Sequence, residues 1–204
     1  MVVTLDDLVR ILSQYSGRDK TLRIAYSILI LYATHIRDEV KSKRLLALSK
    51  QLRSARLVLK QFNHAAALHA AVQLTHCSRE DLVDFLLQVL ARNVNLIHGF
   101  VESLAWLADA NIISLDAVRL FGVCKYLWMV VLFSSIIRLS RILLRKGALI
   151  KCCDETITLL GQVFDFVSVV SALPSNILWA GRLNSTQTTT FSLIASLIAL
   201  YRCF

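Results

Sequence analysis

The sequence contains few of the residues that end helices. It has one proline, Pro174, and six glycines among 204 residues, and these two residue types are the strongest breakers of regular secondary structure. Collagen, proline- and glycine-rich disorder and an all-β sandwich with frequent turns are therefore excluded. The sequence predicts an all-α protein.

Signatures of catalysis and of cofactor binding are also missing. The glycines form neither a phosphate-binding loop nor a dinucleotide fingerprint, and no serine lies in a nucleophile elbow. The five cysteines lack the C-x-x-C spacing of zinc sites, and the histidines in residues 64–76 have no nearby carboxylate. We therefore expect no cofactor, no metal site and no catalytic residue, so that the protein is not an enzyme.

Acidic side chains are fewer than basic ones, whereas apolar side chains are abundant. Hydrophobic residues make up 56% of the chain and the mean hydropathy is +0.59, which is more apolar than a soluble domain of this size normally is. The formal net charge of +9 favours an anionic partner. Because no zinc-finger, RNP or basic-zipper pattern is present, we expect anionic membrane lipids rather than nucleic acid.

One segment combines the apolar and the basic excess. Neither an acidic residue nor a glycine or proline interrupts residues 41–76, which predicts one helix there. Its apolar residues recur at spacings of three and four and share one face: Leu45, Leu48, Leu52, Ala55, Leu59 and Phe62. Its basic residues lie off this stripe: Lys43, Lys50, Arg53, Arg56 and Lys60. The pattern is typical of a helix lying in a lipid interface, and a bundle helix with a solvated basic face has the same periodicity.

Two apolar segments in the second half of the chain are candidates for membrane insertion. Residues 120–137 carry one charge, Lys125, and reach the lower limit for a spanning helix if that lysine extends its amine to the headgroups. The apolar residues 191–201 are too few for an upright crossing. We expect a membrane-associated helical bundle with an amphipathic region over residues 1–119 and one or two embedded helices in residues 120–204. A basic connecting loop in the second region would hold Arg138, Arg141, Arg145, Lys146 and Lys151.

Two tryptophans are each followed, three residues later, by a charge in apolar surroundings. Asp109 follows Trp106 in this way, and Arg182 follows Trp179. A charge in apolar surroundings needs a partner. We therefore predict an ion pair between Asp109 and Arg182, and the alternative is that each lies at a helix end in contact with water.

Several short segments, taken in order, resemble the peroxisomal membrane protein 11 family. They are Ser-Gly-Arg-Asp-Lys-Thr-Leu-Arg at 16–23, the apolar stripe of residues 45–62 with Leu-Arg-Ser-Ala-Arg at its centre, and Ser-Leu-Ile-Ala-Ser-Leu-Ile-Ala-Leu-Tyr at 192–201. Trp-Leu-Ala-Asp-Ala at 106–110 and Leu-Trp-Ala-Gly-Arg at 178–182 look most like the gamma branch of that family.

The resemblance implies a protein of the peroxisomal membrane that promotes elongation, division and proliferation of peroxisomes. Residues 45–62 would then insert into one leaflet and bend the membrane. The family also implies self-association and action together with a tail-anchored fission adaptor and a dynamin-like GTPase. Two alternatives stay open at this point, namely an oligomeric channel for small metabolites and a soluble helical adaptor.

Overall fold

A computed structural model describes residues 5–75, 81–146, 153–173 and 178–203. These residues form helices and the short turns between them, so the predicted all-α fold is confirmed. The helices in order are α1 Leu5–Ser13, α2 Tyr15–His35, α3 Glu39–Gln61, α4 His64–Thr75, α5 Leu82–Asp109, α6 Ala117–Lys146, α7 Cys153–Ser171 and α8 Ser185–Tyr201.

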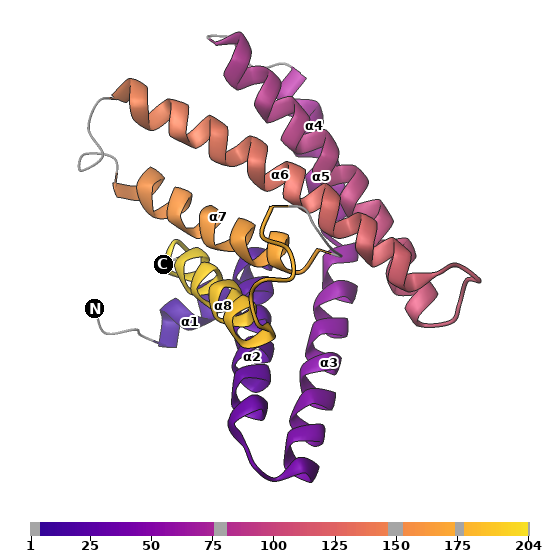
Figure 1. Cartoon of the computed structure of the whole chain (residues 1–204). Coiled ribbons are helices and arrows are strands. Elements are labelled where there is room, and N and C mark those ends of the chain that lie inside the picture. The colour runs from indigo at the N-terminus through magenta and orange to yellow at the C-terminus, as the bar shows by residue number, and fades with distance from the viewer. Residues whose placement is uncertain (1–4, 76–80, 147–152, 174–177, 204) are drawn as a thin grey trace.

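Two helical hairpins form the frame of the molecule (Figure 1). Helices α5 and α6 pack along each other as the longer hairpin, and α2 and α3 form the second, which extends away from it. Helix α7 packs on α6, and α8 lies between α7 and α2, so the C-terminal helices connect the two hairpins. Helix α4 packs against α5, and α1 against α2. Residues from both ends of the sequence therefore meet in one bundle.

Aspartate side chains begin three of the helices. Asp38 accepts hydrogen bonds from the amides of Val40 and Lys41 at 3.0 and 3.2 Å, at the start of α3. In the same way, Asp81 accepts a hydrogen bond from an amide in the first turn of α5, and Asp116 accepts one from an amide in the first turn of α6. An aspartate there satisfies amides that have no partner within the helix and places a negative charge at the positive end of the helix dipole.

The predicted helix over residues 41–76 is divided into α3 and α4. Phe62 and Asn63 form a turn, in which the Asn63 amide donates to the carbonyl oxygen of Lys60 at 3.0 Å. The ring of His64 lies 3.0 Å from the amide oxygen of Gln61 and 3.1 Å from the hydroxyl of Ser103 on α5. Contacts with α5 thus end the helix where the sequence has neither glycine nor proline, and the single-helix prediction is wrong.

Helix α6 contains the predicted span. Residues Ala117–Arg145 are, within the described ranges, the one helix long and apolar enough to cross a membrane by length and composition. The other candidate, α8, has 17 residues and lies between α2 and α7, with Ala195 and Ser196 buried. Of the one or two embedded helices that the sequence predicts, the described residues thus contain one candidate, α6.

The predicted basic connecting loop is wrong for four of its five residues. Arg138, Arg141 and Arg145 belong to α6, because neither glycine nor proline lies between Gly122 and Gly147 and the helix continues through them. Lys146 is the last residue of α6, and Lys151 lies outside the described residues.

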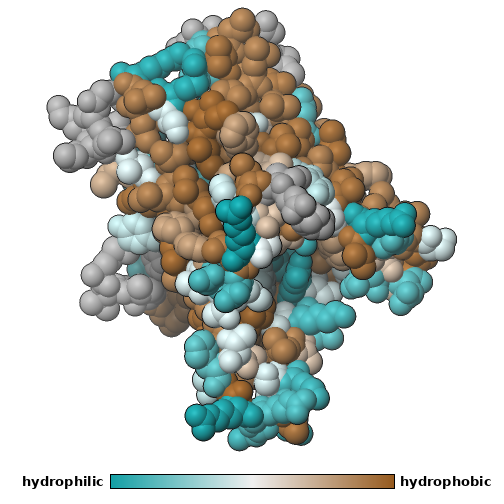
Figure 2. All heavy atoms as spheres, viewed as in Figure 1, coloured by the Kyte–Doolittle hydropathy of each residue, from teal (hydrophilic) through white to brown (hydrophobic). Residues whose placement is uncertain are grey.

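Apolar and polar side chains separate on the face that Figure 2 shows. Hydrophobic residues cover the part formed by α5, α6 and α7, and hydrophilic residues gather at the connection between α2 and α3. Large apolar side chains that are exposed on α5 and α6 include Leu82, Leu86, Leu90, Phe100, Val123, Phe133 and Leu144. So much exposed apolar surface is typical of a protein that contacts lipid or another protein.

Candidate membrane-binding helix and its polar support

The apolar stripe of α3 divides into two lines with a seven-residue repeat. Leu45, Leu52 and Leu59 are half-buried, whereas Leu48, Ala55 and Phe62 are exposed. Leu48 has 50% and Phe62 82% of its surface exposed. Helix α3 packs mainly on α2, and this contact leaves the second line free. We call Leu48 and Ala55 of α3, together with Phe62 in the turn directly after it, the exposed line of α3.

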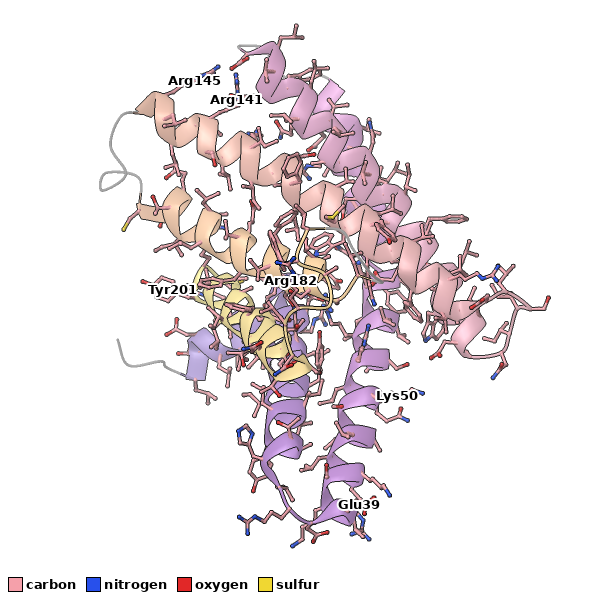
Figure 3. The ribbon with its side chains drawn as sticks, in the orientation of Figure 1. Glu39, Lys50, Arg141, Arg145, Arg182 and Tyr201 are labelled. Carbon is pink, nitrogen blue, oxygen red and sulfur yellow. The ribbon has the colours of Figure 1, made fainter. Side chains whose placement is uncertain are left out.

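The basic residues of α3 also divide into two groups. Lys43, Lys50 and Arg53 are exposed, and Lys50 projects from α3 on the side away from α2 (Figure 3). Arg56 and Lys60 instead turn inward, where Arg56 pairs with Asp19 of α2 and Lys60 with Glu102 of α5. The prediction of one continuous basic face is therefore wrong for Arg56 and Lys60, which hold helices together.

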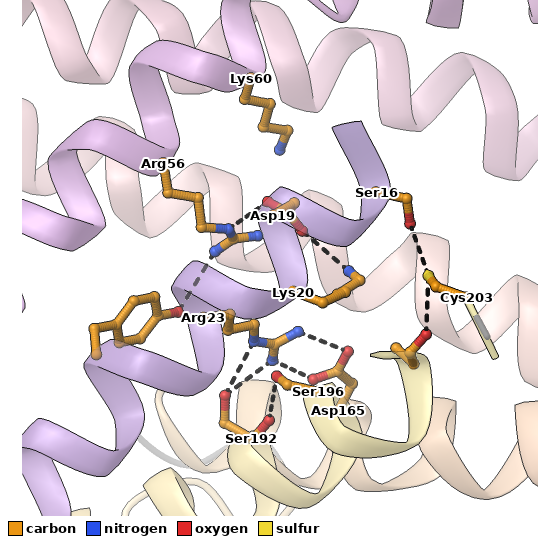
Figure 4. Close-up of polar contacts among 12 residues, drawn as sticks. Ser16, Asp19, Lys20, Arg23, Arg56, Lys60, Asp165, Ser192, Ser196 and Cys203 are labelled. Carbon is orange, nitrogen blue, oxygen red and sulfur yellow. Dashed lines mark hydrogen bonds and ion pairs between the residues drawn. The ribbon is translucent and has the colours of Figure 1, made fainter. Parts of the chain in front are cut away.

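Arg56 belongs to a polar layer in which α2 meets α3 (Figure 4). Its Nε lies 2.5 Å from a carboxylate oxygen of Asp19, and Lys20 contacts the other oxygen at 3.1 Å. Burial raises the pKa of Asp19, but attraction to Arg56 and Lys20 outweighs burial and holds this pKa at about 2. Asp19 is therefore ionised at neutral pH, and the pair fixes α3 on α2.

Arg23 connects α2 to the two C-terminal helices. Its guanidinium donates to the carboxylate of Asp165 on α7 at 3.0 Å and to the hydroxyl of Ser192 on α8 at 3.2 Å (Figure 4). The side chain of Arg23 is 10% exposed and that of Asp165 15%. Because a fork of N–H donors matches a carboxylate, this contact determines position as well as charge.

His98 on α5 adds a titratable group to the same interior. Its Nδ1 lies 3.4 Å from the amine of Lys60, and its ring centre lies 5.4 Å from that of Trp128 on α6. Burial, together with the charge of Lys60, lowers the pKa of His98 to about 4. His98 is therefore neutral at neutral pH.

Helix α1 has an apolar face that contacts little of the protein. Leu5 is 75% exposed and Val9 61%, and Leu8 and Leu12 are exposed beside them. Ile11, on another side of the helix, is 1% exposed. Its carbonyl oxygen lies so close to Gly17 that a Cβ there would overlap it, which fixes the turn into α2. The sequence shows the amphipathic pattern of α1, but it does not show that this face stays uncovered.

The predicted pair of Asp109 and Arg182 is not formed. Asp109 is the last residue of α5 and is exposed, and Arg182 is exposed in the turn before α8. No ion pair joins them in the part of the chain that the structure describes. The backbone amide of Arg182 instead donates to the carbonyl oxygen of Trp179 at 3.1 Å. Each charge reaches water at an element end, so neither needs the other.

In the described ranges, no group of three or more histidine, cysteine, aspartate and glutamate side chains is arranged to hold a metal ion. Several charged residues instead join helices through ion pairs, among them Arg56 with Asp19 and Lys60 with Glu102. These ion pairs hold the amphipathic helix α3 at a defined position beside the apolar helices α5 and α6.

Comparison with known proteins agrees with this architecture. Residues 5–152 match the family Peroxisomal biogenesis factor 11 (PEX11). Peroxisomal membrane protein 11C of Homo sapiens is 25% identical, over 98% of this chain and 95% of the human protein. The mouse protein of the same name, from Mus musculus, is 26% identical over 96% of this chain and 92% of its own length. No solved structure matches the chain.

The family match covers most of the chain and all of α1 to α6. The two relatives carry the name of the gamma branch, so the resemblance predicted from the short segments is confirmed. The chain belongs to the Peroxisomal biogenesis factor 11 family and is a protein of the peroxisomal membrane.

Proposed function

We propose that this protein promotes elongation, division and proliferation of peroxisomes by inserting the exposed line of α3 into one leaflet of the membrane. The observation that carries the proposal is that the exposed line, Leu48, Ala55 and Phe62, stays uncovered beside Lys43 and Lys50, which are exposed on the same helix. Apolar burial contributes about 25 cal/mol per Å², and each cation about 1 kcal/mol near an anionic surface. These two contributions favour adsorption to an anionic bilayer.

The polar layer gives the inserted helix a rigid support. Arg56 and Lys60 fix α3 to α2 and α5, and α5 packs along the candidate span α6. A helix that enters one leaflet expands it relative to the other, which favours curvature. Helix α1, with its exposed Leu5, Leu8 and Val9, is a second element that would enter the same interface.

The function proposed here is not enzymatic. Self-association and cooperation with a tail-anchored adaptor and a dynamin-like GTPase are proposed on the family resemblance. Bending by α3 would then prepare a narrow tubule on which such fission factors act.

The test is a double substitution, Leu48→Glu with Phe62→Glu, in a tagged protein overproduced in cells. Both side chains are exposed, so the substitutions leave the buried core intact while they place charge where the membrane would be. We expect the protein to resist alkaline carbonate extraction and peroxisomes to lose their elongation, scored against a matrix marker. The matched control is Ile112→Glu with Leu115→Glu, which adds the same charge at two exposed apolar residues between α5 and α6. Normal tubules from the α3 variant would overturn the proposal.

An oligomeric channel receives less support from the candidate span. Ser134 of α6 is buried, and its hydroxyl donates to the carbonyl oxygen of Val130 in the same helix at 2.9 Å. Steady selective conductance of the purified protein in planar bilayers would favour the channel. A soluble adaptor is not proposed, because the relatives are named membrane proteins.

A further inference from the structure

A hollow of about 420 Å³ lies among helices that are distant in the sequence. Its wall is formed by residues of α2, α3, α5, α6, α7 and α8. A second hollow of about 440 Å³, between α3 and the start of α6, shares part of this wall. The cations common to both hollows are Lys50, Arg53 and Lys125.

These three cations differ from the charges that join the helices. Arg56 and Lys60 are matched by carboxylates, but Lys50, Arg53 and Lys125 take part in no ion pair among the described residues. Lys125 donates to the carbonyl oxygen of Ala172 at 2.9 Å, and it lies near enough to Arg53 for the two charges to repel. An anion placed between them would relieve this repulsion.

The carboxylates on these walls do not cancel the three cations. Glu102 lines the first hollow and is already paired with Lys60. Asp109 lines the second hollow and is exposed to solvent. The wall that the two hollows share therefore has a surplus of positive charge.

A buried hydroxyl gives an independent indication of a ligand. Ser27 of α2 lines the first hollow and is 0% exposed, and its hydroxyl has no hydrogen-bond partner in the described chain. A buried hydroxyl without a partner is costly, so it points to a group that it would bind. Thr188, Thr189 and Ser192 of α8 bring further hydroxyls to the same wall.

We propose that this hollow binds a phosphate group, with Lys50, Arg53 and Lys125 as charge partners and Ser27 as a hydroxyl donor. A phosphate has several acceptor oxygens and carries negative charge at neutral pH, which suits a site with three cations and nearby hydroxyls. The group is carried either by a phospholipid headgroup or by a soluble phosphate ester. This inference goes beyond the insertion of α3, because it uses Lys50 and Arg53 together with residues of α2 and α6 rather than the exposed line of α3.

Binding is measured with the full chain in detergent, through its tryptophan fluorescence, to which Trp128 in the wall of the hollow contributes. The probes are glycerol 3-phosphate, short-chain phosphatidic acid and, as a control without phosphate, short-chain diacylglycerol. Saturable binding of both phosphate probes identifies a site that accepts soluble esters, and binding of phosphatidic acid alone identifies a headgroup site. Either result supports the proposal, whereas no saturable binding of either phosphate probe overturns it.

Variants then locate the site. Arg53→Gln is expected to weaken binding at least tenfold, while Lys43→Gln, which removes an equal charge from an exposed pair with Glu39, changes it less than twofold. Equal effects of the two substitutions would overturn the assignment.

Ser27→Ala should weaken binding threefold or more while leaving the unfolding temperature unchanged or higher, because it removes an unpartnered buried hydroxyl. These measurements use neither the α3 line variants nor organelle shape, so this proposal and the insertion proposal can fail separately.

Discussion

Two groups of ion pairs use the same residue types, but their arginines differ in burial, whereas Asp165, Asp81 and Asp84 are all between 15% and 20% exposed. In the interior, Arg23 and Asp165 are 10% and 15% exposed. At the far end of the α5–α6 hairpin, Arg141 and Arg145 contact Asp81 and Asp84 (Figure 3). The arginines of this second group, which we call the rim pairs, are 33% and 54% exposed.

The difference in burial decides what each group contributes. Removing one partner of a buried pair leaves a charge without water or a counter-charge, which is strongly destabilising. Removing one partner at an exposed site lets water replace it, and salt already screens the attraction. The interior pairs therefore determine whether α2, α7 and α8 stay together, whereas the rim pairs adjust the end of one hairpin.

The largest expected effect comes from Asp165→Asn. It leaves the guanidinium of Arg23 buried without a carboxylate, and we expect a loss of about 3–5 kcal/mol in the free energy of unfolding. Denaturant unfolding of the detergent-solubilised protein measures this loss. The matched control is Asp154→Asn on the same helix, where the carboxylate is exposed. A double variant, Arg23→Met with Asp165→Leu, should recover most of the stability; equal stability of the Asp165→Asn and Asp154→Asn variants would contradict the comparison.

A smaller effect on the free energy of unfolding is expected from a change of pH. It tests only the interior of the protein, through the titration of His98. The folded protein holds the pKa of His98 near 4, whereas the unfolded chain binds a proton near pH 6.5. Between these values the unfolded state binds more protons, so stability falls as the pH falls. From pH 7 to pH 5.5 we expect a loss of about 1 kcal/mol.

Thermal unfolding at a series of pH values measures this slope. His98→Gln should flatten the curve over that range, since the group that titrates is gone. If the slope of the variant matched that of the unaltered protein, the titration would have to be assigned to another group.

The smallest expected effect belongs to the rim pairs. Arg145→Gln leaves Asp81 and Asp84 in contact with Arg141 and with water, and we expect a change below about 1 kcal/mol that shrinks further in high salt. The measurement is thermal unfolding at low and high ionic strength. A loss as large as that of Asp165→Asn would erase the distinction between the two groups.

The sequence was sufficient to predict the features that depend only on residues close to one another in the chain. The absence of breakers and the repeat of apolar residues predict the helical fold and the span in α6. It also predicts the α3 stripe, because a period of 3.6 residues places those side chains on one face whatever the rest of the chain does.

The features that depend on distant residues were not predicted. The partners of Arg56 and Lys60 lie 37 and 42 residues away, and nothing in the pattern of α3 indicates that these two cations turn inward. The pair of Asp109 and Arg182 was inferred from apolar neighbours in the sequence, yet both residues reach water at element ends. Half of the α3 stripe is likewise covered by α2, which periodicity alone does not reveal.

The contacts of Arg23 also set an order of events during synthesis. Asp165 and Ser192 follow Arg23 by 142 and 169 residues, which corresponds to roughly 8–34 s of translation for the later partner. Until Asp165 has been made, Arg23 lacks its carboxylate partner on α7, whereas Lys60 of the same hairpin can already meet Glu102 of α5. The contacts that join α2 to α7 and α8 through Arg23 therefore form only after most of the protein has been made.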